Sequence, residues 1–184
     1  MEQNILIVVD MQHDFIDGSL GTPEAVQIIP SVLSRIRSYA ADPAGILYAT
    51  LDTHTEQYLD TAEGRHLPVL HCIRGTKGHT LDPAIQTALD ACGCTYVEKP
   101  TFGSLDLVQQ LQQSAKTHPI ASIELCGLCT DICVVSNALL LKAAFPEVPI
   151  SVHASCCAGV TPATHEAALT TMEMCQIHIL REEN

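Results

Sequence analysis

The strongest constraint on the fold is a series of short apolar runs that recur along the chain. The first is ILIVV at 5–9, which is rich in β-branched residues and ends at a single acidic residue, Asp10. A continuous apolar run of this length is typical of a strand buried on both faces in a parallel sheet. Comparable runs lie at 45–51, 122–128 and 148–154, and weaker ones lie at 95–98 and 176–180.

Helical periodicity fills the intervals between these runs. One predicted apolar face contains Val26, Ile29, Val32, Leu33 and Ile36, and another contains Leu105, Leu107, Val108 and Leu111. Two further helices are predicted at 130–145 and 162–175, the second with Thr161 as its N-cap and Pro162 in its first turn. Strands that alternate with helices imply right-handed crossovers between parallel strands. We therefore predict an α/β fold with one domain over residues 1–184: an open, doubly wound, mostly parallel sheet with helices on both faces.

Charge and cysteine content limit the partners and the compartment. The formal net charge of −12 argues against nucleic acid as a partner. No run approaches the roughly 18 apolar residues that a membrane-spanning helix needs, and the N-terminal segment lacks the pattern of a secretion signal. We therefore expect a cytoplasmic protein whose nine cysteines stay reduced. Apolar residues on the later predicted helices are compatible with a homo-oligomer.

Polar residues at the predicted strand ends are the candidates for chemistry, because open α/β sheets bind ligands outside the carboxyl ends of their strands. These residues are Asp10, Asp52, His54 and Lys99, together with Cys133 in the first turn of the helix predicted after 122–128. A helix N-terminus stabilises a thiolate. A carboxylate and an ammonium from other strand ends would supply a base and a partner charge. The alternative is that Cys133 fills the core, Asp10 caps a turn and Lys99 is solvated.

Four motifs at these positions carry a resemblance to a known family. VVDMQHDF contains Asp10, VEKPTFGS contains Lys99, GLCTDICV contains Cys133, and CAGVTPATHEAAL follows near the C-terminus. In this order the sequence resembles the isochorismatase-like cysteine hydrolases, and most of all the nicotinamidases. The resemblance implies that Asp10, Lys99 and Cys133 form a catalytic triad that hydrolyses a small-molecule amide through a thioester. It also implies an oxyanion hole from the backbone N–H groups of Cys129 and Cys133, with a cis peptide bond before Cys129.

A second group of residues suggests a divalent metal ion. Asp52 and His54 are two residues apart, so in an extended chain their side chains share a face. With Glu63 and His71 they form a donor set that suits zinc, manganese or iron better than a closed thiolate site. The resemblance implies a metal held by an Asp-x-His pair, a downstream histidine and a variable fourth ligand, for which Glu63 is preferred to His66. An isolated Asp-x-His pair is also common in surface turns.

The remaining expectations concern substrate and alternatives. The irregular stretch from Thr53 to Thr80 contains four histidines, which favours a functional loop. By resemblance, Phe15 and Phe102 line a slot for a flat ring, although either could belong to the core. The implied reaction converts nicotinamide to nicotinate and ammonia. One alternative is a related amidohydrolase acting on another carboxamide or on a ureido compound. The other is a non-enzymatic metal- or redox-sensing module built on Cys126-x-x-Cys129.

Overall fold

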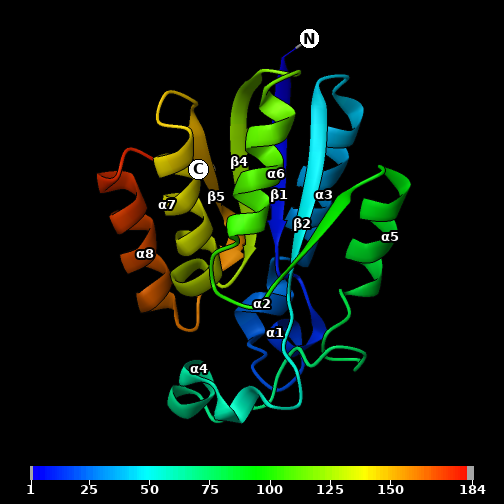
Figure 1. The fold of residues 1–184 in the computed structure, drawn as a ribbon, viewed down its shortest axis with the longest axis vertical. Helices are drawn as coiled ribbons and strands as arrows, with labels where there is room; N and C mark the ends of the chain where they lie inside the picture. Colours follow the sequence, from blue (N-terminus) through cyan, green and yellow to red (C-terminus); the bar gives the residue numbers. More distant parts are fainter. Residues whose placement is uncertain (1, 182–184) are drawn as a thin grey trace.

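The computed structural model describes residues 2–181, and a six-stranded parallel sheet runs through its centre (Figure 1). The strands are β1 (Gln3–Val9), β2 (Gly45–Asp52), β3 (Thr95–Lys99), β4 (Ile120–Leu128), β5 (Ile150–Ala158) and β6 (His178–Leu180). Their order across the sheet is β3-β2-β1-β4-β5-β6. The chain therefore starts at the central strand β1, adds β2 and β3 on one side, and then adds β4, β5 and β6 on the other side. This confirms the doubly wound sheet and all six of the predicted strands.

Helices cover both faces of the sheet, as predicted. One face carries α6 (Leu105–Ala115), α7 (Val135–Ala144) and α8 (Pro162–Met174), which lie in front of the strands in Figure 1. The other face carries α3 (Ile29–Ala41) and α5 (Pro83–Ala91). Shorter helical segments gather beyond the carboxyl ends of the strands: α1 (His13–Ile16), α2 (Pro23–Gln27), a 3₁₀ turn (Tyr58–Asp60) and α4 (Ala62–His66). The apolar sides of the sheet and both helical layers share one core.

The chain reverses its winding direction between β1 and β4, which creates the crevice in which such sheets bind ligands. The two strands approach closely here. Gly127 has a φ of 114°, and a Cβ at this position would collide with the carbonyl oxygen of Val9. Asp10 comes directly after Val9, the last residue of β1. It has a φ of 47°, an uncommon value for a residue with a side chain, and it turns the backbone away from the sheet.

Several local expectations need correction. Val26 does not share the apolar face of α3, because it lies in the separate helix α2 and is 46% exposed. Leu105 is at the start of α6 and is 71% exposed, although Leu107 and Leu111 are buried as expected. The segment 130–145 begins with one π-helical turn, Thr130–Val134, before α7.

The start of α8 was predicted correctly, and helix α5 was not predicted. The side chain of Thr161 accepts a hydrogen bond from the backbone of Thr164, which confirms it as the N-cap of α8. Helix α5 was not predicted, although Asp82 caps it, Pro83 opens it, and Ile85 and Leu89 form its buried face. Those residues carry the usual signals of a helix start.

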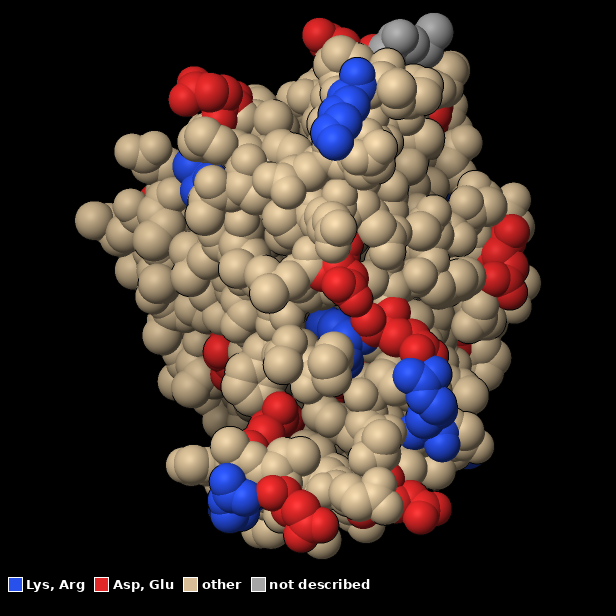
Figure 2. Space-filling model, viewed as in Figure 1, with Lys and Arg blue, Asp and Glu red and all other residues tan. Residues whose placement is uncertain are grey.

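The charged groups on one face of the molecule are dispersed. On the face in Figure 2, red acidic groups and blue basic groups are spread over the molecule, and the basic groups form no continuous area. Within residues 2–181, none of the helices has both the length and the apolar character that crossing a bilayer requires.

Candidate active site and metal-binding residues

A cavity of about 190 Å³ lies at the carboxyl ends of the central strands. Cys133 and Asp52 line it, together with His71 and Glu63 from the stretch that follows β2. The rest of the lining is mostly apolar: Phe15, Leu20, Thr22, Ala25, Leu67, Phe102, Leu128, Cys129, Ile132, Gly159 and Val160. The predicted strand-end residues and the predicted loop residues therefore meet in one place.

Asp10, Lys99 and Cys133 come together beneath this cavity. Lys99 Nζ lies 2.7 Å from Asp10 Oδ2 and donates a hydrogen bond to Cys133 Sγ over 3.4 Å. Thr50 on the neighbouring strand donates a hydrogen bond to Asp10 Oδ1 over 2.6 Å. The three side chains are buried, with at most 4% of each residue exposed. An acid, a cation and a thiol in mutual reach, away from water, can transfer a proton and stabilise the resulting charge.

Burial shifts the ionisation of all three groups. It is the largest cause of the raised pKa of Asp10, and it also raises the pKa of the Cys133 thiol. Burial would lower the pKa of Lys99, but Asp10, Cys133 and Asp52 outweigh it and keep the ammonium protonated. The resting site therefore pairs a neutral thiol with a carboxylate that binds protons more readily than a solvated one. Such a carboxylate is well suited to act as a general base.

The cis peptide bond that the resemblance implied is present next to Cys129. The peptide bond between Leu128 and Cys129 is cis. Cys129 is the N-cap of the π-helical turn, and its carbonyl oxygen accepts hydrogen bonds from the N–H groups of Ile132 and Val134. Cys133 lies in this turn, at the start of the helical segment that continues into α7. The thiol is therefore at the end of a helix at which anions are stabilised.

Asp52, His54 and His71 form a compact group that could hold a metal ion. One potential ligand atom from each lies within 4.8 Å of the others. Asp52 Oδ2 is 2.9 Å from His54 Nε2 and 3.4 Å from His71 Nε2. Among residues 2–181, this is the only group of three or more such side chains with that spacing. Lys99 Nζ also donates to Asp52 Oδ1 over 3.2 Å, so the group touches the Asp10, Lys99 and Cys133 cluster.

The hydrogen bonding of the two histidines fits a metal ion. Val69 O accepts a hydrogen bond from His71 Nδ1 over 2.8 Å, which leaves Nε2 of a neutral ring with its lone pair directed at Asp52. His54 Nε2 is buried and has no hydrogen-bond partner within the described part of the chain, although Asp52 Oδ2 is close. A divalent cation bound between this nitrogen and the Asp52 carboxylate would satisfy both groups.

Glu63 and His66 differ in how they face this group. Glu63 Oε1 lies 3.7 Å from His54 Nε2 and 3.8 Å from His71 Nε2, and it lines the cavity. His66 is exposed, and its Nδ1 atom lies 2.8 Å from the carbonyl oxygen of Ala62 in the same short helix. The structure therefore brings Glu63 and not His66 to the group of Asp52, His54 and His71.

Three aromatic residues border the site. Phe15 is buried, with its ring centroid 5.6 Å from that of His71, whereas Phe102 lines the cavity and is 45% exposed. Tyr58 was missed by the sequence analysis. Its buried ring packs against His54 and His71, and its hydroxyl lies 3.3 Å from Glu63 Oε1. The irregular stretch around Tyr58 gave no periodicity from which its inward position could be inferred.

The other cysteines do not assemble into a site. All nine cysteines fall within the described residues, and none of them forms a disulfide bond there. Cys126 is fully buried in β4, and burial raises the pKa of its thiol well above the usual value. Within residues 2–181, Cys126, Cys129 and Cys133 do not meet the spacing of a metal-binding group. This geometry gives no support to a sensor built on Cys126-x-x-Cys129.

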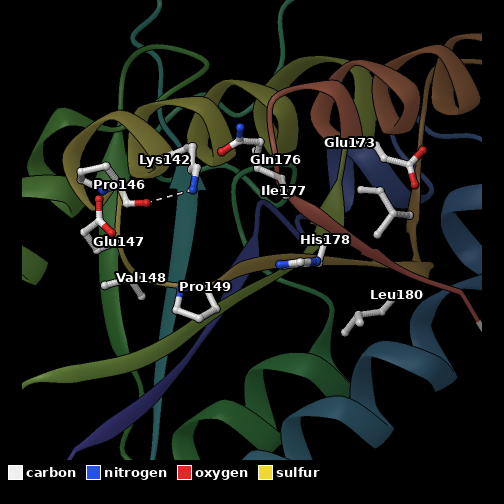
Figure 3. Close-up of a pocket in the computed structure, with 11 residues that line it drawn as sticks. Lys142, Pro146, Glu147, Val148, Pro149, Glu173, Gln176, Ile177, His178 and Leu180 are labelled. Atoms are coloured by element: carbon white, nitrogen blue, oxygen red, sulfur yellow. Dashed lines mark hydrogen bonds between the residues drawn. The ribbon is translucent and has the colours of Figure 1, made fainter.

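A larger hollow of about 710 Å³ lies elsewhere, at the amino ends of β5 and β6 (Figure 3). Lys142 is one of its charged groups, and the carbonyl oxygen of Pro146 accepts a hydrogen bond from its ammonium. In Figure 3, the side chains of Glu147, Glu173 and His178 lie apart from one another. Among the described residues that line this hollow, none is a nucleophile with a neighbouring base.

Comparisons with known proteins bear on the family to which the chain belongs. The family model for the isochorismatase domain matches residues 4–183. A curated relative from Bacillus subtilis (strain 168), described as "Uncharacterized isochorismatase family protein PncA", is 29% identical over 143 residues, covering 73% of this chain and 75% of the relative.

Solved structures show the same fold over almost the whole chain. The nicotinamidase/pyrazinamidase PncA of Bacillus subtilis has a TM-score of 0.83 at 25% identity, covering 97% of this chain and 100% of that one. The pyrazinamidase of Pyrococcus horikoshii, solved in complex with zinc, has a TM-score of 0.78 at 27% identity, covering 98% and 99%. The N-carbamoylsarcosine amidase of Thermoplasma acidophilum has a TM-score of 0.74 at 22% identity, covering 99% and 98%, and this likeness shows the fold alone. With the family model matching nearly all of its length, the chain belongs to the isochorismatase family.

Proposed function

We propose that this amide-hydrolysing member of the isochorismatase family converts nicotinamide to nicotinate and ammonia. The observation that supports this most is the position of the group formed by Asp52, His54 and His71. Asp52 and His71 line the same small cavity as Cys133, and Asp52 is connected to Cys133 through Lys99. A metal-type donor set facing a thiol fits a substrate with a ring nitrogen on one side and a carboxamide on the other. The zinc in the Pyrococcus horikoshii neighbour supports the same assignment.

The first half of the proposed reaction uses the buried triad. Asp10 takes the proton of Cys133, and the thiolate attacks the amide carbon. The backbone N–H groups of Cys129 and Cys133 are assigned to the oxyanion, because donors fixed in advance stabilise the developing charge most. Lys99 keeps its proton throughout and balances the negative charge on Asp10 and on the thiolate. Asp10 then gives its proton to the departing nitrogen, which leaves as ammonia.

The second half restores the enzyme. A thioester now joins the acyl group to Cys133, and a water molecule attacks its carbonyl carbon. Asp10 takes a proton from this water, the bond between carbon and sulfur breaks, and Cys133 regains a proton as the carboxylic acid leaves. One amide and one water thus become one acid and one ammonia.

The cavity walls orient the ring. Asp52, His54, His71 and Glu63 would hold the divalent ion, zinc, manganese or iron, which when bound supplies a Lewis-acid position for the ring nitrogen. Phe15 and Phe102 are proposed to contact the ring faces, since both line the cavity. Its small volume and mostly apolar lining exclude water and favour a flat, compact substrate.

The charge of the lining argues against substrates that carry a carboxylate. Among the described residues that line the cavity, Asp52 and Glu63 are acidic and none is lysine or arginine. A carboxylate in this position would be desolvated beside two acidic side chains, without a lysine or arginine of the lining to pair with. We therefore favour a neutral carboxamide over a ureido acid such as the substrate named for the Thermoplasma acidophilum neighbour.

Ammonia release tests the substrate assignment directly. The zinc-loaded protein is incubated with nicotinamide, pyrazinamide or N-carbamoylsarcosine, and ammonia and the acid product are measured. Nicotinamide should be turned over, and the Cys133→Ala variant should release no ammonia. Release from another amide but not from nicotinamide would contradict the substrate assignment and leave the reaction class intact.

A compartment is proposed as well. The nine cysteines form no disulfide bond among the described residues, which fits a reducing compartment, so the cytoplasm is the proposed location. The homo-oligomer expected from exposed apolar residues stays a prediction.

A further inference from the structure

Gln12 is fully buried next to the metal-binding group, and nothing in the proposed reaction uses it. Its side-chain Oε1 accepts a hydrogen bond from the backbone N–H of Asp52 over 2.7 Å. Its Nε2 donates to the carbonyl oxygen of Asp52 over 2.9 Å and to that of His79 over 2.8 Å. Both N–H groups and the oxygen of this amide are therefore bound to backbone atoms.

The topology explains why Asp52 needs this amide. Strand β1 pairs with β2 only as far as Val9 opposite Thr50, and the backbone N–H of Asp10 then donates to Thr50 O over 3.2 Å. Asp10 turns away from the sheet at this point. In a strand, alternate residues direct their backbone groups to the same neighbour. Asp52 therefore faces β1 as Thr50 does, but no β1 backbone is left to meet it.

The side chain of Gln12 takes the place of that missing backbone. Unpaired N–H and C=O groups in a buried position cost free energy, which the amide removes at Asp52. It lets β2 extend past the end of β1, to the level at which Asp52 meets Lys99 on β3. Through His79, the same amide also holds the end of the long stretch that carries His54, Glu63 and His71.

The position of the Asp52 carboxylate determines its contacts with both histidines and with Lys99. This carboxylate is within 3.4 Å of His54 Nε2, His71 Nε2 and Lys99 Nζ. We propose that Gln12 is a positioning residue for the metal-binding group: it fixes the backbone of Asp52 and thereby the direction of the carboxylate. This inference rests on the proposed metal-dependent function.

Asn137 provides a matched control. It is also a buried amide with three backbone partners: Ser104 N–H donates to its Oδ1 over 2.9 Å, and its Nδ2 donates to Phe102 O over 3.1 Å and to Cys133 O over 2.8 Å. None of these partners belongs to the metal-binding group. Replacing it should lower stability for the same general reason, without the effect on metal binding.

The test compares Gln12→Met with Asn137→Leu, each close in shape to the residue it replaces. The proteins are stripped with a chelator and titrated with zinc by calorimetry, at a temperature at which circular dichroism shows the metal-free variants to be folded. Both variants should unfold at a lower temperature than the parent. Gln12→Met should raise the zinc dissociation constant about 10–100-fold, as the loss of outer-shell partners does elsewhere. Asn137→Leu should change it by less than about twofold, since separate sites seldom couple.

A second variant covers a failure of Gln12→Met to fold. Gln12→Asn keeps the amide but withdraws it by one methylene, and it should also weaken zinc binding. Unchanged zinc affinity in the folded Gln12 variants, or an equal loss in Asn137→Leu, would overturn the role of Gln12 and leave the proposed function standing. A parent protein that binds no zinc would instead contradict the metal-dependent function itself, and the inference with it.

Discussion

The ammonium of Lys99 donates a hydrogen bond to Asp52 Oδ1 over 3.2 Å while it lies 2.7 Å from Asp10 Oδ2. One buried cation thus connects the proposed general base to the proposed metal-binding group. The three side chains are each at most 4% exposed. Because buried charges persist only when they are paired, the two carboxylates depend on the same lysine.

Replacing Lys99 by Met should therefore reduce both turnover and stability. The change removes the ammonium that both carboxylates contact, and removing one partner of a buried ion pair typically costs about 3–5 kcal/mol in unfolding free energy. Denaturant unfolding of the metal-free protein measures it. Adding Asp10→Asn removes the negative charge of the Asp10 carboxylate, so the double variant should be more stable than Lys99→Met alone. A double variant of equal or lower stability would show that charge burial is not the cause.

The nine cysteines should differ sharply in their effect on turnover. Cys133→Ala removes the nucleophile, and kcat/KM should fall by at least about 10³-fold, the scale seen when a nucleophile is lost. Cys126→Ala, in the centre of β4, should keep most of the activity. In the parent protein, rapid quenching and mass spectrometry should find an acyl group on Cys133. A similar loss of activity in both variants would mean that the nucleophile is assigned to the wrong cysteine.

The residues whose proximity the sequence predicted share one property. Asp10, Asp52 and Lys99 stand at the ends of their strands, and Cys133 follows β4 by one turn. In a parallel sheet all these ends lie at the same edge, so a list of strand ends is also a list of neighbours. The order β3-β2-β1-β4 then places them around one crevice. For these residues, burial pattern and chain order were enough.

Gln12 and Tyr58 show where the sequence was not enough. The partners of Gln12 are backbone atoms 40 and 67 residues away, so no complementary side chain marks the contact. Tyr58 lies in a stretch without periodicity, and its contacts with His54 and His71 depend on how that stretch folds back. The prediction for Val26 was wrong for a different reason. Its apolar spacing matched α3, but the break at Ile28 and Pro30 at the start of α3 separate the two helices.

Metal removal should abolish nicotinamide turnover reversibly. A chelator should inactivate the protein, and zinc, manganese or iron should restore activity. His71→Ala should lose the ion because His71 Nε2 faces Asp52 and Glu63, whereas His66→Ala should keep it because His66 is exposed and bound only within α4. Metal content per chain, measured by elemental analysis, distinguishes these variants. Equal metal content in both would exclude His71 as a ligand.

The acid side of the pH profile should report Asp10. The base must be deprotonated, so kcat/KM should fall as the pH drops through the pKa of Asp10, which burial raises. The hydroxyl of Thr50 opposes that shift, because it donates to Asp10 Oδ1 over 2.6 Å and stabilises the carboxylate. Thr50→Val keeps the shape of the side chain and removes this hydrogen bond. The pKa of Asp10 should then rise further, and the acid limb should move to higher pH.

The size of this movement follows from the strength of the bond. A hydrogen bond to a charged group contributes about 1.5–3 kcal/mol, which corresponds to a displacement of about 1–2 pH units. Ser122→Ala is the control. Ser122 lies near the amino end of β4, at the opposite edge of the sheet from Asp10, and its hydroxyl donates to Asn4 Oδ1. Its removal should leave the profile unchanged. Profiles of kcat/KM from initial rates of ammonia release give the comparison. Since loss of the bond can only disfavour the carboxylate, an acid limb that stays in place or moves to lower pH in Thr50→Val would show that Asp10 is not the base.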